Sequence, residues 1–167
     1  KTGYRFWKWG GFGETRPLYG LHELAQNPDK AVLVVEGEKA ADAAKAMFQD
    51  HVVITWNGGA AAVKKANWQP LVGRDVTIWP DNDKAGYGAA ENVEKILTAF
   101  NKEAGNKATV RTIDVPNTFP EKWDLADALP TGVTTDDVKG MVGKADKGQK
   151  LPSTVDIENK ILEQRIK

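Results

Sequence analysis

The chain has 167 residues, of which 41% are hydrophobic and 28% are charged, so it suits one domain of ordinary size with a short appendage. No stretch approaches the roughly 20 apolar residues of a membrane span, and the absence of cysteine excludes disulfides, Cys-ligated zinc and a thiol nucleophile. The formal net charge of +0 excludes a basic field over the whole molecule, so a nucleic acid would have to bind through a local patch or through metal.

Residues 1–16 form an aromatic and basic N-terminal segment. It interleaves Tyr4, Phe6, Trp7, Trp9 and Phe12 with Lys1, Arg5 and Lys8. Such a pattern could stack on bases, but the favoured interpretation is the remnant of a preceding subdomain that covers a hydrophobic edge. Because the chain does not begin with Met, we expect it to be an excised part of a longer protein.

Buried strands and amphipathic helices alternate through the middle of the chain. A short helix is expected between residues 17 and 28, strands at 31–35, 52–55, 75–79 and 109–115, and helices at 39–48 and 62–66. A further helix after the third strand buries Ala89, Val93, Ile96, Leu97 and Phe100. The pattern predicts an α/β fold, a compact Rossmann-like parallel sheet of about four strands with helices on both faces. Right-handed crossovers then place all C-terminal strand ends on one edge.

The C-terminal third is expected to be less regular. After a loop, residues 123–129 are expected to form a helical turn, and residues 134–137 could cap a last small helix. Residues 143–153 have the composition of a linker, and Ile157, Ile161 and Leu162 mark a terminal amphipathic helix. We therefore divide the chain into the segment 1–16, a main domain 17–142, and a linker with terminal helix 143–167.

Carboxylates stand at the ends of two apolar strands. Glu36 directly follows the first strand, and Asp81 and Asp83 follow the third. Together on the carboxyl edge of a parallel sheet, where ligands gather, they predict a divalent-metal site for phosphate chemistry. Simpler interpretations remain open, since an Asp after a strand often caps a helix and a Glu there suits the helix dipole. A calcium loop of the EF-hand type is excluded, because Ala85 and Asn92 would occupy two ligand positions.

A glycine-containing turn follows the second strand. Asn57, Gly58 and Gly59 would let backbone amides approach phosphates, and Lys64 and Lys65 could contact a nucleic-acid backbone. An ordinary turn followed by a solvated helix face explains the same residues equally well. The chain contains neither a P-loop nor a complete dinucleotide fingerprint.

Two further acids and both histidines have simpler explanations when each is taken alone. Asp124 and Asp127 lie three residues apart and would share one side of the expected helical turn, where a surface role is more common than a ligand. His22 and His51 have no metal-like partners nearby in the sequence, so we interpret both as structural.

Three motifs occur in an order that is typical of one family. They are Glu36-Gly37-Glu38, then Asn57-Gly58-Gly59-Ala60 followed by lysines, then Asp81-Asn82-Asp83-Lys84-Ala85-Gly86. This combination resembles the Toprim domain of bacterial-type primases, type IA and II topoisomerases and certain nucleases. The likeness covers about residues 17–130 and is greatest to primases and primase–helicases of phages and mobile elements.

The resemblance implies a role for each motif residue. Glu36 looks like the family's general acid/base or metal-proximal Glu, and Asp81 and Asp83 look like its catalytic pair that binds Mg²⁺ or Mn²⁺. Phage primases often carry K-D-x-N-[DE] after the fourth strand. Here Asp124 and Asp127 match both acids, whereas the Lys and the Asn are missing. Asp124 is therefore a third candidate metal ligand and Asp127 a weaker one.

The implied function is metal-dependent nucleotidyl transfer by a primase that makes primers from NTPs on single-stranded DNA. The implied phosphate contacts are Lys39, Gly58, Gly59, Lys64, Lys65 and Lys84. A replicative helicase is an expected partner, a membrane is not, and the cysteine-free composition agrees with a cytoplasmic location. The alternatives are a Toprim nuclease and a non-catalytic module for nucleic-acid binding or assembly. The chain carries no Cys-based zinc-binding domain and no helicase P-loop.

Overall fold

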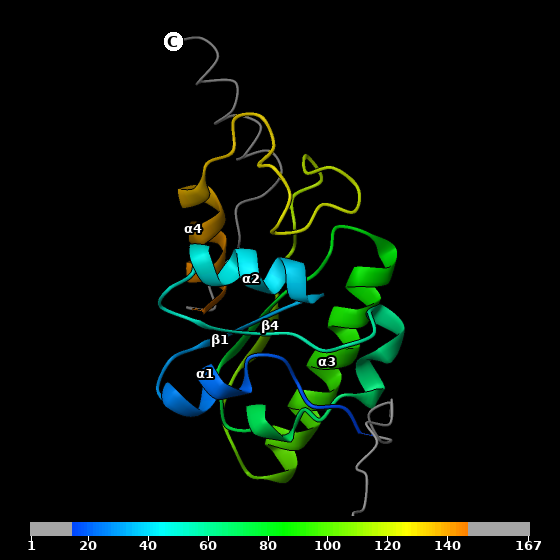
Figure 1. Cartoon of the computed structure of the whole chain (residues 1–167). Helices are drawn as coiled ribbons and strands as arrows, with labels where there is room; N and C mark the ends of the chain where they lie inside the picture. Colours follow the sequence, from blue (N-terminus) through cyan, green and yellow to red (C-terminus); the bar gives the residue numbers. More distant parts are fainter. Residues whose placement is uncertain (1–14, 147–167) are drawn as a thin grey trace, which may run out of the picture.

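A four-stranded parallel sheet forms the centre of the molecule (Figure 1), for which the computed structural model describes residues 15–146. The strands are β1 Val32–Val35, β2 Val52–Ile54, β3 Val76–Trp79 and β4 Val110–Thr112. They lie in the order β2-β1-β3-β4, and every neighbouring pair is parallel. The predicted α/β class with a parallel sheet of four strands is thereby confirmed.

Helices cover both faces of this sheet. The α-helices are α1 Leu21–Gln26, α2 Glu38–Met47, α3 Lys84–Glu103 and α4 Thr135–Asp146, and the 3₁₀ helices are η1 Ala60–Lys65 and η2 Gln69–Leu71. Helices α2 and α4 pack on one face of the sheet, whereas α1 and α3 pack on the other (Figure 1). Among residues 15–146, no helix combines the length and apolar character that a bilayer crossing requires.

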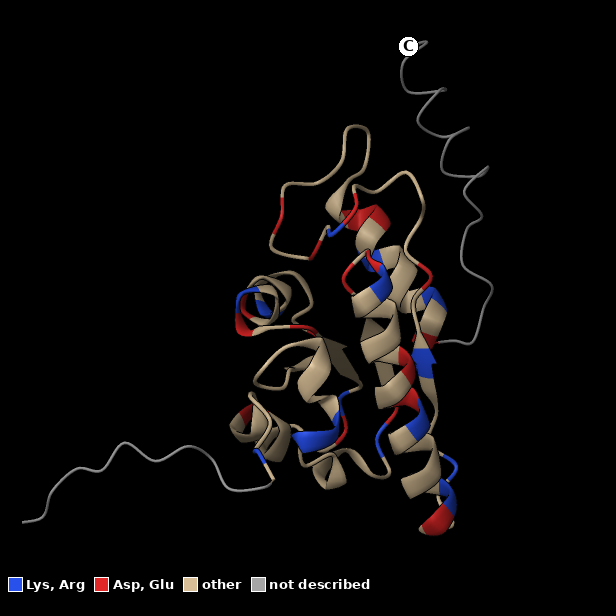
Figure 2. Cartoon of the chain, turned by 90° about the vertical axis from the view of Figure 1, so that its right-hand side faces the viewer, with Lys and Arg blue, Asp and Glu red and all other residues tan. Residues whose placement is uncertain are grey.

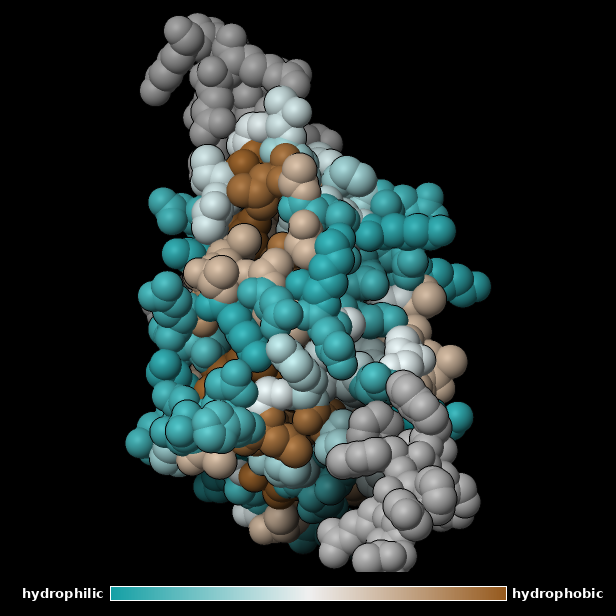
Figure 3. Space-filling view, in the orientation of Figure 1, coloured by the Kyte–Doolittle hydropathy of each residue, from teal (hydrophilic) through white to brown (hydrophobic). Residues whose placement is uncertain are grey.

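The two faces bury separate cores because side chains alternate along each strand. Val32 and Val34 face α3 with its Leu97, whereas Leu33 and Val35 face α2 and α4. All four residues of β1 are at most 2% exposed, so the strand is a continuous apolar run, as parallel strands covered on both faces require. Outside these cores, hydrophilic side chains cover most of the face seen in Figure 3, and apolar areas interrupt it in places.

The expected helix at residues 62–66 is a 3₁₀ helix that begins earlier, at Ala60. Its backbone bonds join residues three apart, from the amide of Ala62 to the carbonyl of Gly59 and from Ala66 to Val63. The indole of Trp68 also donates to the Val63 carbonyl at 2.9 Å, and Ala66 is extended. The segment is therefore too short and too closely tied to Trp68 to continue as an α-helix.

Two other elements differ from the expectation. The fourth strand covers only Val110–Thr112, because the Val115 amide leaves the sheet to bond the hydroxyl of Tyr87 at 2.9 Å. The expected helical turn at 123–129 is an irregular loop. The Asp124 carboxylate accepts the Ala126 amide at 2.6 Å, a local bond that competes with helix formation.

The last small helix is confirmed and is longer than expected. The Thr134 hydroxyl accepts the Asp137 amide at 3.2 Å, and the Asp137 carboxylate accepts the Thr134 amide at 3.0 Å, which together cap α4. Residues 143–146 form its last turn, with Ala145 in the core, so the expected linker does not begin at 143. The rest of that linker, the expected terminal helix and residues 1–14 lie outside the described residues.

His51 joins α4 to the sheet through carboxylates. Its ring nitrogens lie 2.9 Å from Asp50 and 2.8 Å from Asp146, and the imidazole is only 7% exposed. The hydrogen bond with Asp146 is the main reason why the pKa of His51 is raised, although burial opposes it. Burial opposes ionisation of Asp146 too, but hydrogen bonds from His51 and Thr77 outweigh it and lower the pKa of Asp146. The structural interpretation of His51 therefore agrees with its contacts.

Replacement of Asp146 by asparagine is expected to destabilise the fold in a pH-dependent manner. The raised pKa of His51 stabilises the fold below about pH 6.5, and this contribution is lost as the pH rises through the folded pKa. The lowered pKa of Asp146 adds stability above about pH 4. Urea unfolding should show a loss of about 1–3 kcal/mol for Asp146→Asn near pH 6 and a smaller loss near pH 9. Equal losses at both pH values would contradict an ionic role for the pair.

Candidate metal and phosphate site at the carboxyl edge

The connections between strands run in opposite directions on the two sides of the central pair β1 and β3. From β1 the chain crosses to β2 on one side and then returns to β3 on the other side. Ligands of open parallel sheets bind at such a switch point, outside the carboxyl ends of the strands. Val35 pairs with Trp79, so Glu36 and Asp81 follow the ends of neighbouring strands, which lie roughly 4.8 Å apart. The structure thus brings two of the predicted carboxylates to one place.

Glu36 is half-buried against the turn that follows β2. Its carboxylate accepts a hydrogen bond from the Ala60 amide, and a Cβ atom at Gly59 would lie 3.7 Å from its Oε1. Burial raises the pKa of Glu36, the Ala60 amide lowers it, and the charge of Asp83 raises it further. Gly58 and Gly59 have φ values of 103° and 69°, a region that favours glycine. The turn at Gly58 and Gly59, which the sequence predicted to approach phosphates, therefore packs against Glu36, a candidate catalytic residue.

Asp81 is the most perturbed carboxyl group at this edge. Burial, followed by the charges of Glu36, Asp124, Asp83 and Asp127, raises its pKa to about 7. Carboxylates from three separate stretches of the chain therefore act on the side chain of Asp81. Acidic residues, red in Figure 2, also occur lower on the molecule, but the four charges named above act on the same side chain. Four like charges around one carboxyl group are unfavourable without a cation.

Asp83 caps the N-terminus of helix α3, as its simpler interpretation proposed. Its Oδ1 accepts the Gly86 amide at 2.8 Å, a helix N-cap that commits one carboxylate oxygen to local structure. Gly86 is buried, and a Cβ there would lie 2.4 Å from the Asp81 carbonyl oxygen. The absence of a side chain at Gly86 therefore lets the first turn of α3 pack directly on the backbone of Asp81.

Asn82 holds the third acidic stretch in place, a role that sequence reasoning missed. Its side-chain amide donates to the carbonyls of Phe119 and Pro120 at 3.0 and 2.9 Å. Its backbone amide donates to Trp123 at 3.1 Å. These bonds bring Asp124 to Asp81 from a loop with little regular structure. No nearby sequence signal points to partners 37 and 38 residues further along the chain.

Asp124 and Asp127 form a small turn that contacts Lys39. The Asp127 carboxylate accepts the Asp124 amide at 3.1 Å, and its other oxygen lies 3.7 Å from Lys39 Nζ. The Lys39 side chain is 73% exposed, so this ion pair contributes little stability and leaves the amine accessible. The predicted phosphate contact Lys39 thus lies at the acidic edge.

The three other lysines predicted to contact phosphates are exposed. Lys84 is the first residue of α3, directly after Asp83. Lys64 and Lys65 lie at the far end of η1, so that helix separates them from the Gly59 turn. Arg16 was not among the predicted residues, yet its guanidinium donates to the Asn57 carbonyl at 3.1 Å and supports the turn.

The donor set suits a metal ion that keeps part of its water shell. Across residues 15–146, no group of three His, Asp or Glu side chains is placed to hold a metal by itself. Mg²⁺ usually binds one or two carboxylates and completes its shell with water and substrate phosphates. Asp81, with its raised pKa and neighbouring carboxylates, fits that mode, with Asp83, Glu36 and Asp124 beside it.

The fold and the edge define a parallel α/β protein with an acidic switch point. A family model described as a domain of unknown function (DUF6371) matches residues 5–82. The match includes Glu36, Gly58, Gly59 and Asp81, and it ends before Asp83. No match to a curated protein was found.

Proposed function

We propose that this chain is the Toprim-type catalytic module of a DNA primase of the phage or mobile-element kind. The observation that carries the proposal is the meeting of Glu36 and Asp81 at the switch point between β1 and β3. The order of the three motifs in the sequence supports the same assignment. The raised pKa of Asp81 supports a cation-binding role for this edge.

In this proposal the acidic residues have two tasks, metal binding and proton transfer. Asp81 and Asp83 would hold Mg²⁺ or Mn²⁺, with Glu36 and Asp124 beside them. The ion would offset the negative charge of the triphosphate. Glu36 would accept the proton of the 3′-hydroxyl that attacks the α-phosphorus, and pyrophosphate would leave. Lys39 and Lys84, both exposed at this edge, would contact phosphates.

A templated primer-synthesis assay with single-stranded DNA, NTPs and Mn²⁺ tests the proposal. Wild type is expected to make oligonucleotides, and Glu36→Gln to reduce the rate at least about a hundredfold, because the proton acceptor is lost. Glu103→Gln, an exposed carboxylate at the end of α3, is the matched control and should behave as wild type.

Two other results would each contradict primase activity. Cleavage of the DNA without any need for NTPs, lost in Glu36→Gln, would assign the same acids to a nuclease. No synthesis and no cleavage by wild type, with nucleic-acid binding retained, would leave a non-catalytic binding module.

A further inference from the structure

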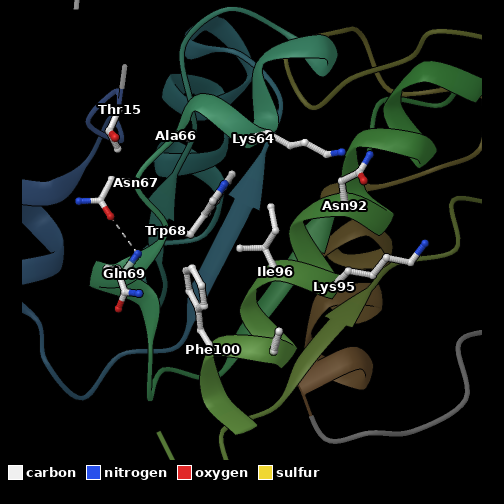
Figure 4. Close-up of a pocket in the computed structure, with 11 residues that line it drawn as sticks. Thr15, Lys64, Ala66, Asn67, Trp68, Gln69, Asn92, Lys95, Ile96 and Phe100 are labelled. Atoms are coloured by element: carbon white, nitrogen blue, oxygen red, sulfur yellow. Dashed lines mark hydrogen bonds between the residues drawn. The ribbon is translucent and has the colours of Figure 1, made fainter. Parts of the chain in front are cut away.

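A groove lies between η1–η2 and helix α3, away from the acidic edge. Its volume is about 610 Å³, and Trp68, Ile96 and Phe100 form its apolar floor (Figure 4). Trp68 is 2% exposed and is fixed by its indole bond to Val63. Ile96 and Phe100 are only partly buried, so they offer apolar surface to an occupant.

The rim of this groove is polar and basic. Lys64 stands on the η1 side and Lys95 on α3, with the amide of Asn92 between them, and Asn67 lies on the opposite side of the groove beside Gln69 (Figure 4). None of the described residues that line the groove is acidic. Lys95 pairs with Glu91 at 2.5 Å, but both side chains are about two-thirds exposed, and such pairs exchange partners at a cost of at most about 1 kcal/mol.

Both walls of the groove lead back to the acidic edge. Helix η1 begins beside Gly59, which lies against Glu36, and carries Lys64 in its last turn. Helix α3 begins after Asp83 and reaches Asn92 nine residues later, about 14 Å along its axis. A chain molecule held in the groove would therefore continue to the acidic edge within a few monomer lengths.

We propose that this groove binds single-stranded nucleic acid, with Lys64 and Lys95 on its phosphates and a base against Phe100. Lysines beside an aromatic ring that is accessible to bases are the combination that binds single strands without sequence preference, and Phe100 is only partly buried. A duplex does not suit the floor, because its bases are stacked and cannot reach the ring. The identification of the strand as a primase template rests on the proposed function; the binding itself does not.

Charge complementarity favours this occupant over the N-terminal segment of the same chain. Thr15 lines the groove, so residues 1–14 precede it directly in the sequence. That segment carries Lys1, Arg5 and Lys8 and no acid before Glu14, so its charge has the same sign as the rim. The phosphates of a polyanion have the opposite charge and can pair with both rim lysines, Lys64 and Lys95.

Fluorescence anisotropy with labelled oligo-dT of about 16 nucleotides tests the groove. The full chain is titrated without metal or nucleotide over a range of salt concentrations. Lys64→Ala/Lys95→Ala is expected to weaken binding about tenfold and to reduce the slope of log affinity against log salt by about 1.4, since each phosphate contact contributes about 0.7. Phe100→Leu should weaken binding about fivefold or more with an unchanged slope, because it removes stacking and not charge.

The matched control is Lys139→Ala/Lys144→Ala, which removes two exposed lysines from α4 on the other face of the sheet. It should bind as wild type, and thermal unfolding verifies that every variant is folded. Three results would each contradict binding in the groove. They are equal losses of oligo-dT affinity in the two double variants, an unchanged affinity in Phe100→Leu, and no binding by wild type. Preference for duplex DNA or for an acidic peptide would overturn it too.

The proposed function and the groove can fail separately. Oligo-dT binding that depends on Lys64 and Phe100, without primer synthesis, would contradict the primase and leave the groove intact. Primer synthesis by a chain whose groove variants bind oligo-dT normally would contradict the groove alone.

Discussion

Asp81→Asn is expected to abolish metal-dependent activity and, at the same time, to stabilise the metal-free fold. The carboxylate lies at the switch point, where burial and four neighbouring acids raise its pKa to about 7. Loss of a metal ligand removes several kcal/mol of transition-state stabilisation, so primer synthesis should fall at least about a hundredfold. Calorimetric titration should show the loss of Mn²⁺ binding directly.

The gain in stability follows from the direction of the pKa shift. A carboxyl group whose pKa rises from 3.8 to about 7 on folding opposes folding whenever the pH exceeds its unfolded value. The full shift corresponds to about 4 kcal/mol, and solvent screening at this partly exposed group reduces the expected effect to about 1–2 kcal/mol. Without metal, urea unfolding of Asp81→Asn near pH 8 should show this gain, and it should shrink as the pH falls toward about 4.

The two effects together separate a metal ligand from a structural residue. Asp29→Asn, an exposed acid outside the edge, is the control and should change neither stability nor activity. Mn²⁺ should raise the melting temperature of wild type by mass action and leave Asp81→Asn unchanged. A destabilised Asp81→Asn that still binds Mn²⁺ would refute the assignment of Asp81 as a ligand.

Gly86→Ala is expected to destabilise the protein although alanine favours helices. Its Cβ would lie 2.4 Å from the carbonyl oxygen of Asp81 and 2.8 Å from its Cβ, and the backbone atom cannot move without shifting the acidic edge. Overpacking of this kind typically costs about 1–3 kcal/mol. Mn²⁺ binding should weaken as well, because the displaced group is the main candidate ligand.

Gly88 provides a control in the same helix. A Cβ at Gly88 would meet nothing within 4 Å, so Gly88→Ala should stabilise the protein by up to about 1 kcal/mol through helix propensity. Chemical unfolding and Mn²⁺ titration of both variants measure the difference. If both alanines had the same effect, close packing on Asp81 would not be the reason for a glycine at position 86.

The fold class could be predicted because its signals are local. Short apolar runs predict the burial of β1 and β3, and alternation with helices indicates a parallel sheet. Of the predicted α3 stripe, Ala89, Val93 and Leu97 are buried, whereas Ile96 and Phe100 are only partly buried because they line the groove. Short or irregular elements were predicted less well. Residues 62–66 and 123–129 have helical composition, yet the Trp68 indole and the Asp124 carboxylate bond nearby backbone groups and override it.

Sequence alone identified which carboxylates follow strands and predicted that Glu36 and Asp81 share one edge, because parallel strands point in the same direction. Only the tertiary structure decided that β1 and β3 are neighbours, since pairing between strands far apart in the chain depends on how both faces are covered. It alone brought Asp124 to Asp81, through Asn82, and lined one groove with residues from η1, η2 and α3. Contacts between such distant segments produce no periodic pattern in the sequence, because each segment by itself has the sequence of an ordinary loop or helix.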